Sequence, residues 1–182
     1  MLDPKRTYWF PMRVTYGREL TIKEFLDNAN IENFIPMHYE FTEHKGERKK
    51  ELVPAVKNLI FVRLTQKRLT EMKMYDRNFE PLRYIMREST IDSLHEIMTV
   101  EDKAMDNFLK VAKEPTENVF FLSPGEYINN MGKKVKITAG PFAGVEGTIK
   151  RIKRNKHVVV QLEDIAAAAI DFVPNDYLIE MI

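Results

Sequence analysis

Three glycines within the eight residues from Gly140 to Gly147 constrain the C-terminal part of this chain more than any other feature of the sequence. Gly140 precedes Pro141, and this pair favours a tight turn, because glycine can adopt positive φ and proline fixes its own φ. Gly144 and Gly147 permit a second sharp bend before the next strand. Four flanking apolar residues are expected to face a core: Val135, Ile137, Val145 and Ile149. The segment therefore predicts short β-strands joined by tight turns.

The rest of the C-terminal segment continues this pattern of short strands. Apolar residues suited to strands recur at residues 148–152, 158–162 and 170–173, with turn residues between them. Several short strands within about 55 residues are typical of a small β-barrel. The run from Ile165 to Ile170 holds four consecutive alanines, the residue with the highest helix propensity, but its neighbours predict strands. We therefore expect residues 125–182 to form an SH3-like β-barrel.

The first 113 residues alternate strand and helix patterns instead. Periodicity predicts the order β-α-β-β-α-β with a closing helix, at residues 7–14, 18–29, 34–41, 59–64, 69–74, 82–86 and 100–112. This order predicts a ferredoxin-like α/β sandwich. The segment 114–124 has linker composition and is bracketed by Pro115 and Pro124. The expected fold class is α+β, with an N-terminal domain at residues 1–113, a linker at 114–124 and the C-terminal barrel.

Composition narrows the class of protein further. The 182 residues include no cysteine, which excludes disulfides, thiolate metal sites and cysteine nucleophiles. No apolar run approaches the roughly 18 residues of a membrane span, and the N-terminus lacks the apolar stretch of a signal peptide. We therefore expect a cytoplasmic protein that does not bind membranes. Cations gather between Lys133 and Lys156 and only acids follow Val158, which favours polar partners of either sign.

No arrangement of residues in the sequence predicts a catalytic site. The four histidines stand apart, without the spacing of a metal-binding motif: His38, His44, His95 and His157. The chain has neither a phosphate-binding loop ending in Gly-Lys-Ser/Thr nor a Gly-x-Ser-x-Gly nucleophile elbow. We therefore expect a binding protein, without a metal ion or a cofactor, rather than an enzyme.

The segment from Gly132 to Ile149 resembles the KOW motif, which occurs in NusG, in its paralogues and in some ribosomal proteins. The N-terminal half resembles the NusG N-terminal domain. Tyr8-Trp9-Phe10 is similar to that family's opening strand, and residues 53–62 are similar to its strand that usually reads Pro-Gly/Asn-Tyr-Leu/Val-Phe-Val. Lys57 and Leu59 depart from this pattern. The resemblance implies a transcription elongation factor, similar to the UpxY-type paralogues of gut Bacteroidota that regulate surface polysaccharide operons.

The resemblance also implies that the N-terminal domain binds the clamp helices of RNA polymerase through an apolar concavity. The implied contact residues are Phe10, Leu59, Phe61 and Tyr84. Interfaces of this kind favour aromatic anchors in a desolvated centre. Leu59 and Phe61 share one face of their strand because side chains alternate, and we predict that this pair points outward. The alternative is that all four residues belong to the core of the sheet.

A second implied partner is the non-template DNA strand of the transcription bubble. The candidates lie on and around the first helix and the second strand: Arg13, Tyr16, Arg18, Lys23 and His38. Cationic side chains would contact phosphates, and the tyrosine would stack on a base. The alternative is an ordinary solvated surface. Arg18 and Lys23 are five positions apart on a helix, so they do not lie strictly on one face.

For the barrel, the resemblance implies binding to ribosomal protein S10 or to the termination factor Rho. The expected partner surface comprises Phe142, Ile165, Ile170, Arg151 and Arg154. Clustered cations on the barrel would also suit salt-sensitive, sequence-independent binding to nucleic acid. We expect a monomer. The alternative function is a ribosome- or RNA-associated KOW protein with an unrelated N-terminal domain, which would expose a basic rather than an apolar sheet face.

Overall fold

A computed structural model of the protein describes residues 2–88, 94–127 and 132–181. The chain has an α+β fold and divides into two compact units. The first unit comprises Met1–Pro36 and Val56–Asp102, and the second comprises Met37–Ala55 and Lys103–Ile182.

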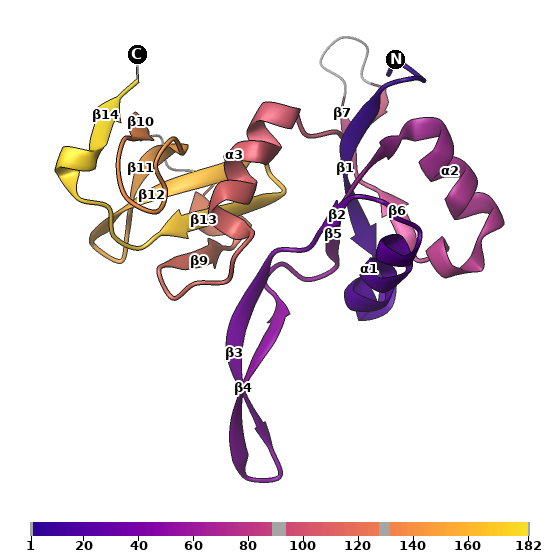
Figure 1. Cartoon of the computed structure of the whole chain (residues 1–182), viewed down its shortest axis with the longest axis horizontal. Helices are drawn as coiled ribbons and strands as arrows, with labels where there is room; N and C mark the ends of the chain where they lie inside the picture. The colour runs from indigo at the N-terminus through magenta and orange to yellow at the C-terminus, as the bar shows by residue number, and fades with distance from the viewer. Residues whose placement is uncertain (1, 89–93, 128–131, 182) are drawn as a thin grey trace. The chain divides into compact units, whose positions relative to one another are not determined.

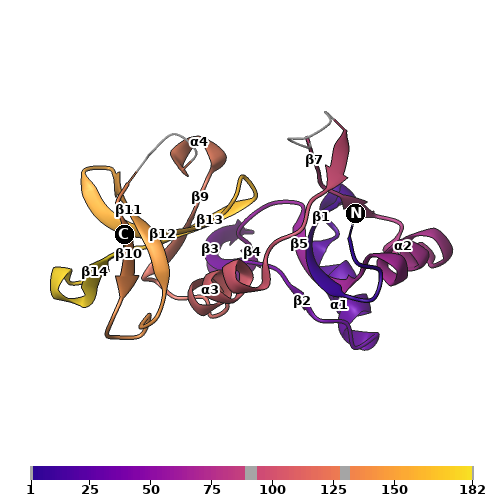
Figure 2. The same ribbon diagram turned by 90° about the horizontal axis from the view of Figure 1, so that it is seen from above.

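A four-stranded antiparallel sheet with two helices forms the first unit. Its strands follow the order β2-β5-β1-β6. They span Thr7–Val14 (β1), Asn33–Phe34 (β2), Leu59–Thr65 (β5) and Leu82–Tyr84 (β6). The helices span Glu19–Asn28 (α1) and Gln66–Tyr75 (α2), and both lie on the same side of the sheet in Figures 1 and 2. This is the arrangement of a ferredoxin-like sandwich, as the order of elements predicted.

Smaller elements complete the first unit. Short 3-10 turns span Thr15–Gly17 (η1) and Arg77–Phe79 (η2). A two-stranded ladder joins β7 and β8, at Met86–Glu88 and His95–Ile97. The carbonyl of Trp9 also accepts a hydrogen bond from the Val100 N–H at 2.9 Å, which ties the chain beyond β8 to β1.

Alternation along β1 and β5 decides which side chains enter the core of this unit. Phe10 pairs with Val62 and Met12 with Ile60, so these four residues share one sheet face, and all are buried. Tyr84 lies on the same face, opposite Met12, and its hydroxyl forms a hydrogen bond with Thr70 Oγ1 of α2 at 2.9 Å. This is therefore the face that the helices cover.

The second unit contains a β-hairpin, a helix and a six-stranded sheet. The hairpin pairs β3 (Met37–His44) with β4 (Glu47–Pro54), and the helix is α3 (Asp102–Ala112). The sheet follows the order β14-β10-β11-β12-β13-β9. Its strands span Val119–Leu122 (β9), Lys134–Ile137 (β10), Glu146–Ile152 (β11), Asn155–Leu162 (β12), Ala166–Ile170 (β13) and Leu178–Glu180 (β14). The short α4 (Pro124–Tyr127) and η3 (Asn175–Tyr177) complete this small β domain.

The four alanines are the first four residues of β13, which lies between β12 and β9. Ala167 and Ala169 pack against Leu122 and Val159 in one buried cluster, whereas Ala168 lies on the opposite face, beside Phe121. All four alanines are at most 1% exposed. Burial on both faces of the strand therefore outweighs their helix propensity. The strand predicted at residues 170–173 ends instead at Ile170.

Two other boundaries differ from the sequence-based expectation. The strand predicted at residues 34–41 is two strands, β2 and β3, which belong to different sheets. The segment expected to be a linker, residues 114–124, contains β9, which pairs with β13 along its whole length. The compact units divide the chain at Pro36, Ala55 and Asp102 instead of at residue 113. Separate folding of residues 1–113 stays a prediction.

Helix α3 packs against the barrel through both polar and aromatic contacts. Asn107 donates from its side-chain amide to the Glu146 carbonyl at 2.5 Å and accepts from the Glu146 N–H at 2.8 Å. The rings of Phe108 and Phe121 meet edge to face with centroids 6.4 Å apart. The amide of Asn107 thus satisfies both backbone groups of one β11 residue, and α3 is fixed beside the glycine-rich turn.

None of the helices within residues 2–88, 94–127 and 132–181 combines the length and apolarity that crossing a membrane requires.

Candidate functional site

The sheet of the first unit carries an aromatic face on the side opposite its helices. We define this face by Trp9, Phe34, Leu59 and Phe61. Phe34 lies directly opposite Phe61, and their rings stack with centroids 6.3 Å apart and planes 27° from parallel. Strand β2 is the edge of this sheet, so Phe34 lies at the rim of the face. Clustered aromatic side chains of this kind are the usual anchors of a protein interface.

The structure divides the four predicted polymerase contacts between the two faces of the sheet. Leu59 and Phe61 lie together on the aromatic face, as strand alternation predicted. Phe10 lies on the helix-covered face, fully buried, with its ring edge-on to Tyr84 at 5.7 Å. Burial raises the pKa of Tyr84, whose hydroxyl is held by Thr70. Phe10 and Tyr84 therefore occupy the core, which was the alternative reading of these residues.

Within the aromatic face, the residues differ in how far they are buried. Leu59 is 4% exposed and Phe61 is fully buried, whereas Phe34 is half-buried. A carboxylate placed at Phe61 would be desolvated, so its effect on a partner could not be separated from loss of stability. Phe34 is the better probe of this face. Contact of Leu59 and Phe61 with a partner stays a prediction.

Cations flank the aromatic face. Arg13 and Arg83 are exposed and lie directly opposite each other on β1 and β6. Arg63 is placed over the Trp9 ring, 5.9 Å from its centroid, and it pairs with Glu32 at 3.3 Å and Asp102 at 3.4 Å. The face therefore has an apolar centre, an exposed arginine pair on one side and a neutralised arginine on the other.

Tyr16 and Arg18 form an exposed corner directly after β1. Tyr16 is 87% exposed with φ of 64°, and Gly17 follows it with φ of 62°. The Arg18 guanidinium lies over the tyrosine ring, 5.6 Å from its centroid. The left-handed conformation costs a residue other than glycine roughly 1 kcal/mol. An exposed aromatic held in this way, beside a cation, suits stacking on a flat ligand.

Neighbouring contacts hold this corner in place. The Thr15 N–H donates to the Pro81 carbonyl at 3.1 Å. Glu19, at the start of α1, is buried and accepts a hydrogen bond from the Asn58 N–H at 2.5 Å. The helix N-terminus also favours a carboxylate at that position. The residues on both sides of the corner are therefore held by hydrogen bonds to other parts of the unit.

Two other predicted nucleic-acid contacts, Lys23 and His38, have polar partners of their own. Lys23 forms an ion pair with Asp27 at 3.1 Å and a hydrogen bond with Asn33 at 3.3 Å. This network lowers the pKa of Asp27, through the Asn33 amide first and then through Lys23. His38 lies in the β3–β4 hairpin of the second unit and pairs with Glu40 at 3.0 Å. Among the predicted nucleic-acid contacts, Tyr16 and Arg18 are thus two side chains that touch each other.

The residues of the predicted partner surface of the barrel differ in their exposure to solvent. Phe142 and Ile165 are half-buried, and Arg151 and Arg154 are exposed. Ile170 is fully buried, because β13 lies between two strands and both of its faces are covered. Ile170 therefore belongs to the core of the barrel, which corrects its assignment to the partner surface.

Lys153 and Arg154 form the tight turn between β11 and β12, with φ of 47° and 74°. Two positive φ values favour glycine or asparagine, so a Lys-Arg pair here is costly and displays two cations at the tip. Lys150, in contrast, is buried and donates to the Tyr127 carbonyl and to Gln161 Oε1. Burial lowers the pKa of Lys150. The exposed cations of the barrel therefore include the pair at this turn but exclude Lys150.

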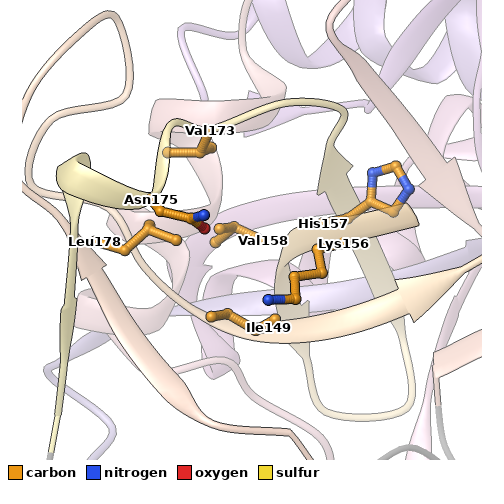
Figure 3. Close-up of a pocket in the computed structure, with 7 residues that line it drawn as sticks. All are labelled: Ile149, Lys156, His157, Val158, Val173, Asn175 and Leu178. Atoms are coloured by element: carbon orange, nitrogen blue, oxygen red, sulfur yellow. The ribbon is translucent and has the colours of Figure 1, made fainter. Parts of the chain in front are cut away.

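A shallow recess opens on the barrel beside β12 and the segment that follows β13 (Figure 3). It is lined by Ile149, Lys156, His157, Val158, Val173, Asn175 and Leu178. Phe172, which is 77% exposed, lines an adjoining recess with Asp171 and Lys156. Phe172 is not among the predicted contacts because the apolar pattern of residues 170–173 predicts a strand. Its signal was an aromatic residue directly after an acidic one at a strand end.

Among the residues that the structure describes, no three acidic, histidine or cysteine side chains gather as a metal site. The arrangement offers instead surfaces for binding: the aromatic face, the Tyr16 corner and the cationic turn of the barrel.

Two family models match separate parts of the chain. Residues 7–109 match the family model described as "NusG: Transcription termination factor nusG", and residues 131–163 match that of the KOW motif. A comparison with curated proteins gave no match. Among solved structures, the chain is similar to one described as "Domain interaction in Thermotoga maritima NusG", at 16% identity and a TM-score of 0.47. That alignment covers 97% of this chain and 98% of the other.

Proposed function

The chain belongs to the NusG family of transcription factors, and we propose on this premise that it binds RNA polymerase and promotes processive, antiterminated elongation. The observation that carries the proposal is the aromatic face within the matched domain. Its accessible part is Phe34, half-buried at the rim, which suits an apolar helical partner, and the polymerase clamp helices are the partner proposed here. In protein interfaces, a few aromatic side chains that lose water together contribute most of the binding free energy.

The proposed contact is tested best at Phe34. Phe34→Glu places a charge at the rim of the aromatic face, and we expect retention of core RNA polymerase to fall about tenfold or more. Because Phe34 is half-buried on an edge strand, the charge keeps access to water and the fold should persist. The measurement is co-purification at moderate salt, with the Trp9 fluorescence transition as the check on folding.

Met74→Glu is the matched control for this substitution. Met74 is 68% exposed on α2, so the same charge is added to the helical side of the unit. This variant should retain polymerase as well as the unmodified chain does. Equal retention by both variants would show that the aromatic face is not the polymerase contact.

We further propose that the Tyr16 corner contacts the non-template DNA strand. Arg18→Glu should weaken binding to an assembled elongation complex and leave affinity for core polymerase without nucleic acid unchanged. Loss of one phosphate contact lowers the salt slope of binding by about 0.7 for a single strand. Both quantities are measured by titration with labelled complexes at several salt concentrations.

Arg68→Glu serves as the control for the DNA contact, since Arg68 is exposed on α2. An equal loss by Arg18→Glu with and without nucleic acid would assign Arg18 to the polymerase interface instead. No loss in either experiment would indicate that Arg18 is an ordinary solvent-exposed residue without a partner contact.

The remaining parts of the proposal concern the type of factor and the barrel. The UpxY-type role in polysaccharide operons rests on sequence resemblance and is tested by transcript mapping in a deletion strain. For the barrel, S10 and Rho are the proposed partners, and Phe172 is the exposed aromatic residue that such a partner would contact first.

The alternative function, a ribosome- or RNA-associated KOW protein, draws support from the exposed Lys153–Arg154 turn and from the exposed Arg13–Arg83 pair. Co-sedimentation with ribosomes, rather than with polymerase, would favour it.

A further inference from the structure

The β3–β4 hairpin is a long two-stranded ribbon (Figure 1), and its two faces differ in chemistry. Alternation and register place Tyr39, Phe41, Arg48, Lys50 and Leu52 on one face, which we call the stacking face. Tyr39 is 49% exposed and Phe41 is 61% exposed. Aromatic side chains with this much exposure on a ribbon represent apolar surface that is left in contact with water.

Each aromatic ring of the stacking face is accompanied by a cation from the opposite strand. The Arg48 guanidinium lies 4.3 Å from the Phe41 ring centroid, and Lys50 Nζ lies 4.8 Å from that of Tyr39. Lys50 also pairs with Glu117 at 3.1 Å, but both side chains are substantially exposed, so water weakens this pair. The face therefore carries two ring–cation pairs about 6.8 Å apart along the strand.

Carboxylates are concentrated on the opposite face of the ribbon. This opposite face carries Glu40, Glu47 and Glu51, together with one lysine, Lys49. The stacking face carries Arg48 and Lys50 against Glu43, which lies beside the turn. The ribbon thus presents a positive aromatic face and a negative face, although its strands hold similar numbers of acids and bases.

We propose that the stacking face of the β3–β4 ribbon binds single-stranded nucleic acid. A nucleotide joins a flat base to an anionic phosphate, and each ring–cation pair offers a complement to both groups. Unpaired bases stack on aromatic rings without regard to sequence, whereas bases in a duplex are not accessible in this way. The carboxylate face repels the phosphate backbone, so a strand would bind on one side of the ribbon only.

The same side chains also form cross-strand pairs that stabilise the ribbon, Phe41 with Lys50 and Tyr39 with Leu52. A test must therefore remove stacking without removing apolar area. Phe41→Leu does this, because leucine keeps an apolar side chain at the same position. Arg48→Gln and Lys49→Gln form a matched pair: each removes one positive charge from the same strand, on opposite faces.

The experiment titrates the full chain into a labelled oligothymidine of about 15 nucleotides and follows fluorescence anisotropy. Phe41→Leu should weaken binding about fivefold or more, because stacking on one aromatic ring carries this much affinity. Arg48→Gln should weaken binding and lower the salt slope by about 0.7, whereas Lys49→Gln should change neither. Arg68→Glu should bind as the unmodified chain does, since Arg68 is exposed on α2 of the other unit and belongs to neither proposed DNA contact.

Three outcomes would overturn the proposal. They are failure of the unmodified chain to bind the oligonucleotide at low salt, equal losses in Arg48→Gln and Lys49→Gln, and unchanged binding by Phe41→Leu. The last would mean that Phe41 does not stack on a base. A duplex of the same length should bind more weakly, and an oligouridine of equal length distinguishes RNA from DNA through the 2′-hydroxyl. Because no polymerase is present, the result is independent of the proposed polymerase contact.

Discussion

Gly147→Ala should lower the stability of the barrel by about 2–3 kcal/mol, although the same substitution in most strands is stabilising. A Cβ at position 147 would lie 2.8 Å from the Val159 carbonyl oxygen and 2.7 Å from a methyl group of Val158. The carbonyl belongs to the backbone of β12 and cannot rotate away, so β11 and β12 must separate. A small domain should lose roughly 10 °C or more in its thermal midpoint.

Gly125→Ala is the control, because a Cβ at Gly125 meets nothing within 4 Å. The chain contains a single tryptophan, Trp9, which lies in the first unit, so its fluorescence follows that unit alone. Circular dichroism follows both units. We expect Gly147→Ala to shift the circular dichroism transition far more than the fluorescence transition. An unchanged midpoint would mean that the two strands tolerate a wider spacing at this point.

Ala168→Leu should destabilise the barrel by about 1–3 kcal/mol, which is the usual cost of adding methylene groups to a packed core. Ala168 is fully buried and lies beside Phe121, which contacts Phe108 of α3. A larger side chain here must displace either the helix or the neighbouring strand. The measurement is denaturant unfolding, in which the midpoint should fall while the slope stays constant.

Ala143→Leu provides the comparison for this substitution, since Ala143 is exposed in the glycine-rich turn of the same unit. It should unfold at the midpoint of the unmodified chain. If Ala168→Leu were equally harmless, the alanines of β13 would not be required for close packing, and their small size would need another explanation.

Periodicity predicted most elements of the first unit because α1 buries one stripe of side chains and β5 is a continuous apolar run. It predicted α1 at residues 18–29 and β5 at 59–64, close to the observed Glu19–Asn28 and Leu59–Thr65. It failed at β9, because the flanking prolines and polar residues have linker composition. The pairing that orders β9 comes from β13, which is distant in sequence, and local propensity does not report such contacts.

The candidate site was predictable to the same extent. Alternation along β5 showed that Leu59 and Phe61 share a face, and the register shows that Phe10 lies on the other. The register between strands could not be obtained from the sequence. The four proposed contacts were therefore predicted as one surface, although they lie on two opposite faces of the sheet. The Tyr16 corner was identified from residue types alone, but its left-handed turn and its contact with Arg18 depend on the tertiary hydrogen bonds of Thr15 and Glu19.

The position of α3 has a practical consequence for preparing parts of this protein. The matched family domain ends at residue 109, yet α3 extends to Ala112 and packs on the barrel. A fragment that begins after α3 would expose Phe121 and the alanine strand to water, next to the unpaired edge of β9. Bare apolar surface beside a free strand edge promotes aggregation. Fragments of the barrel should therefore start before Asp102 if they are to remain soluble.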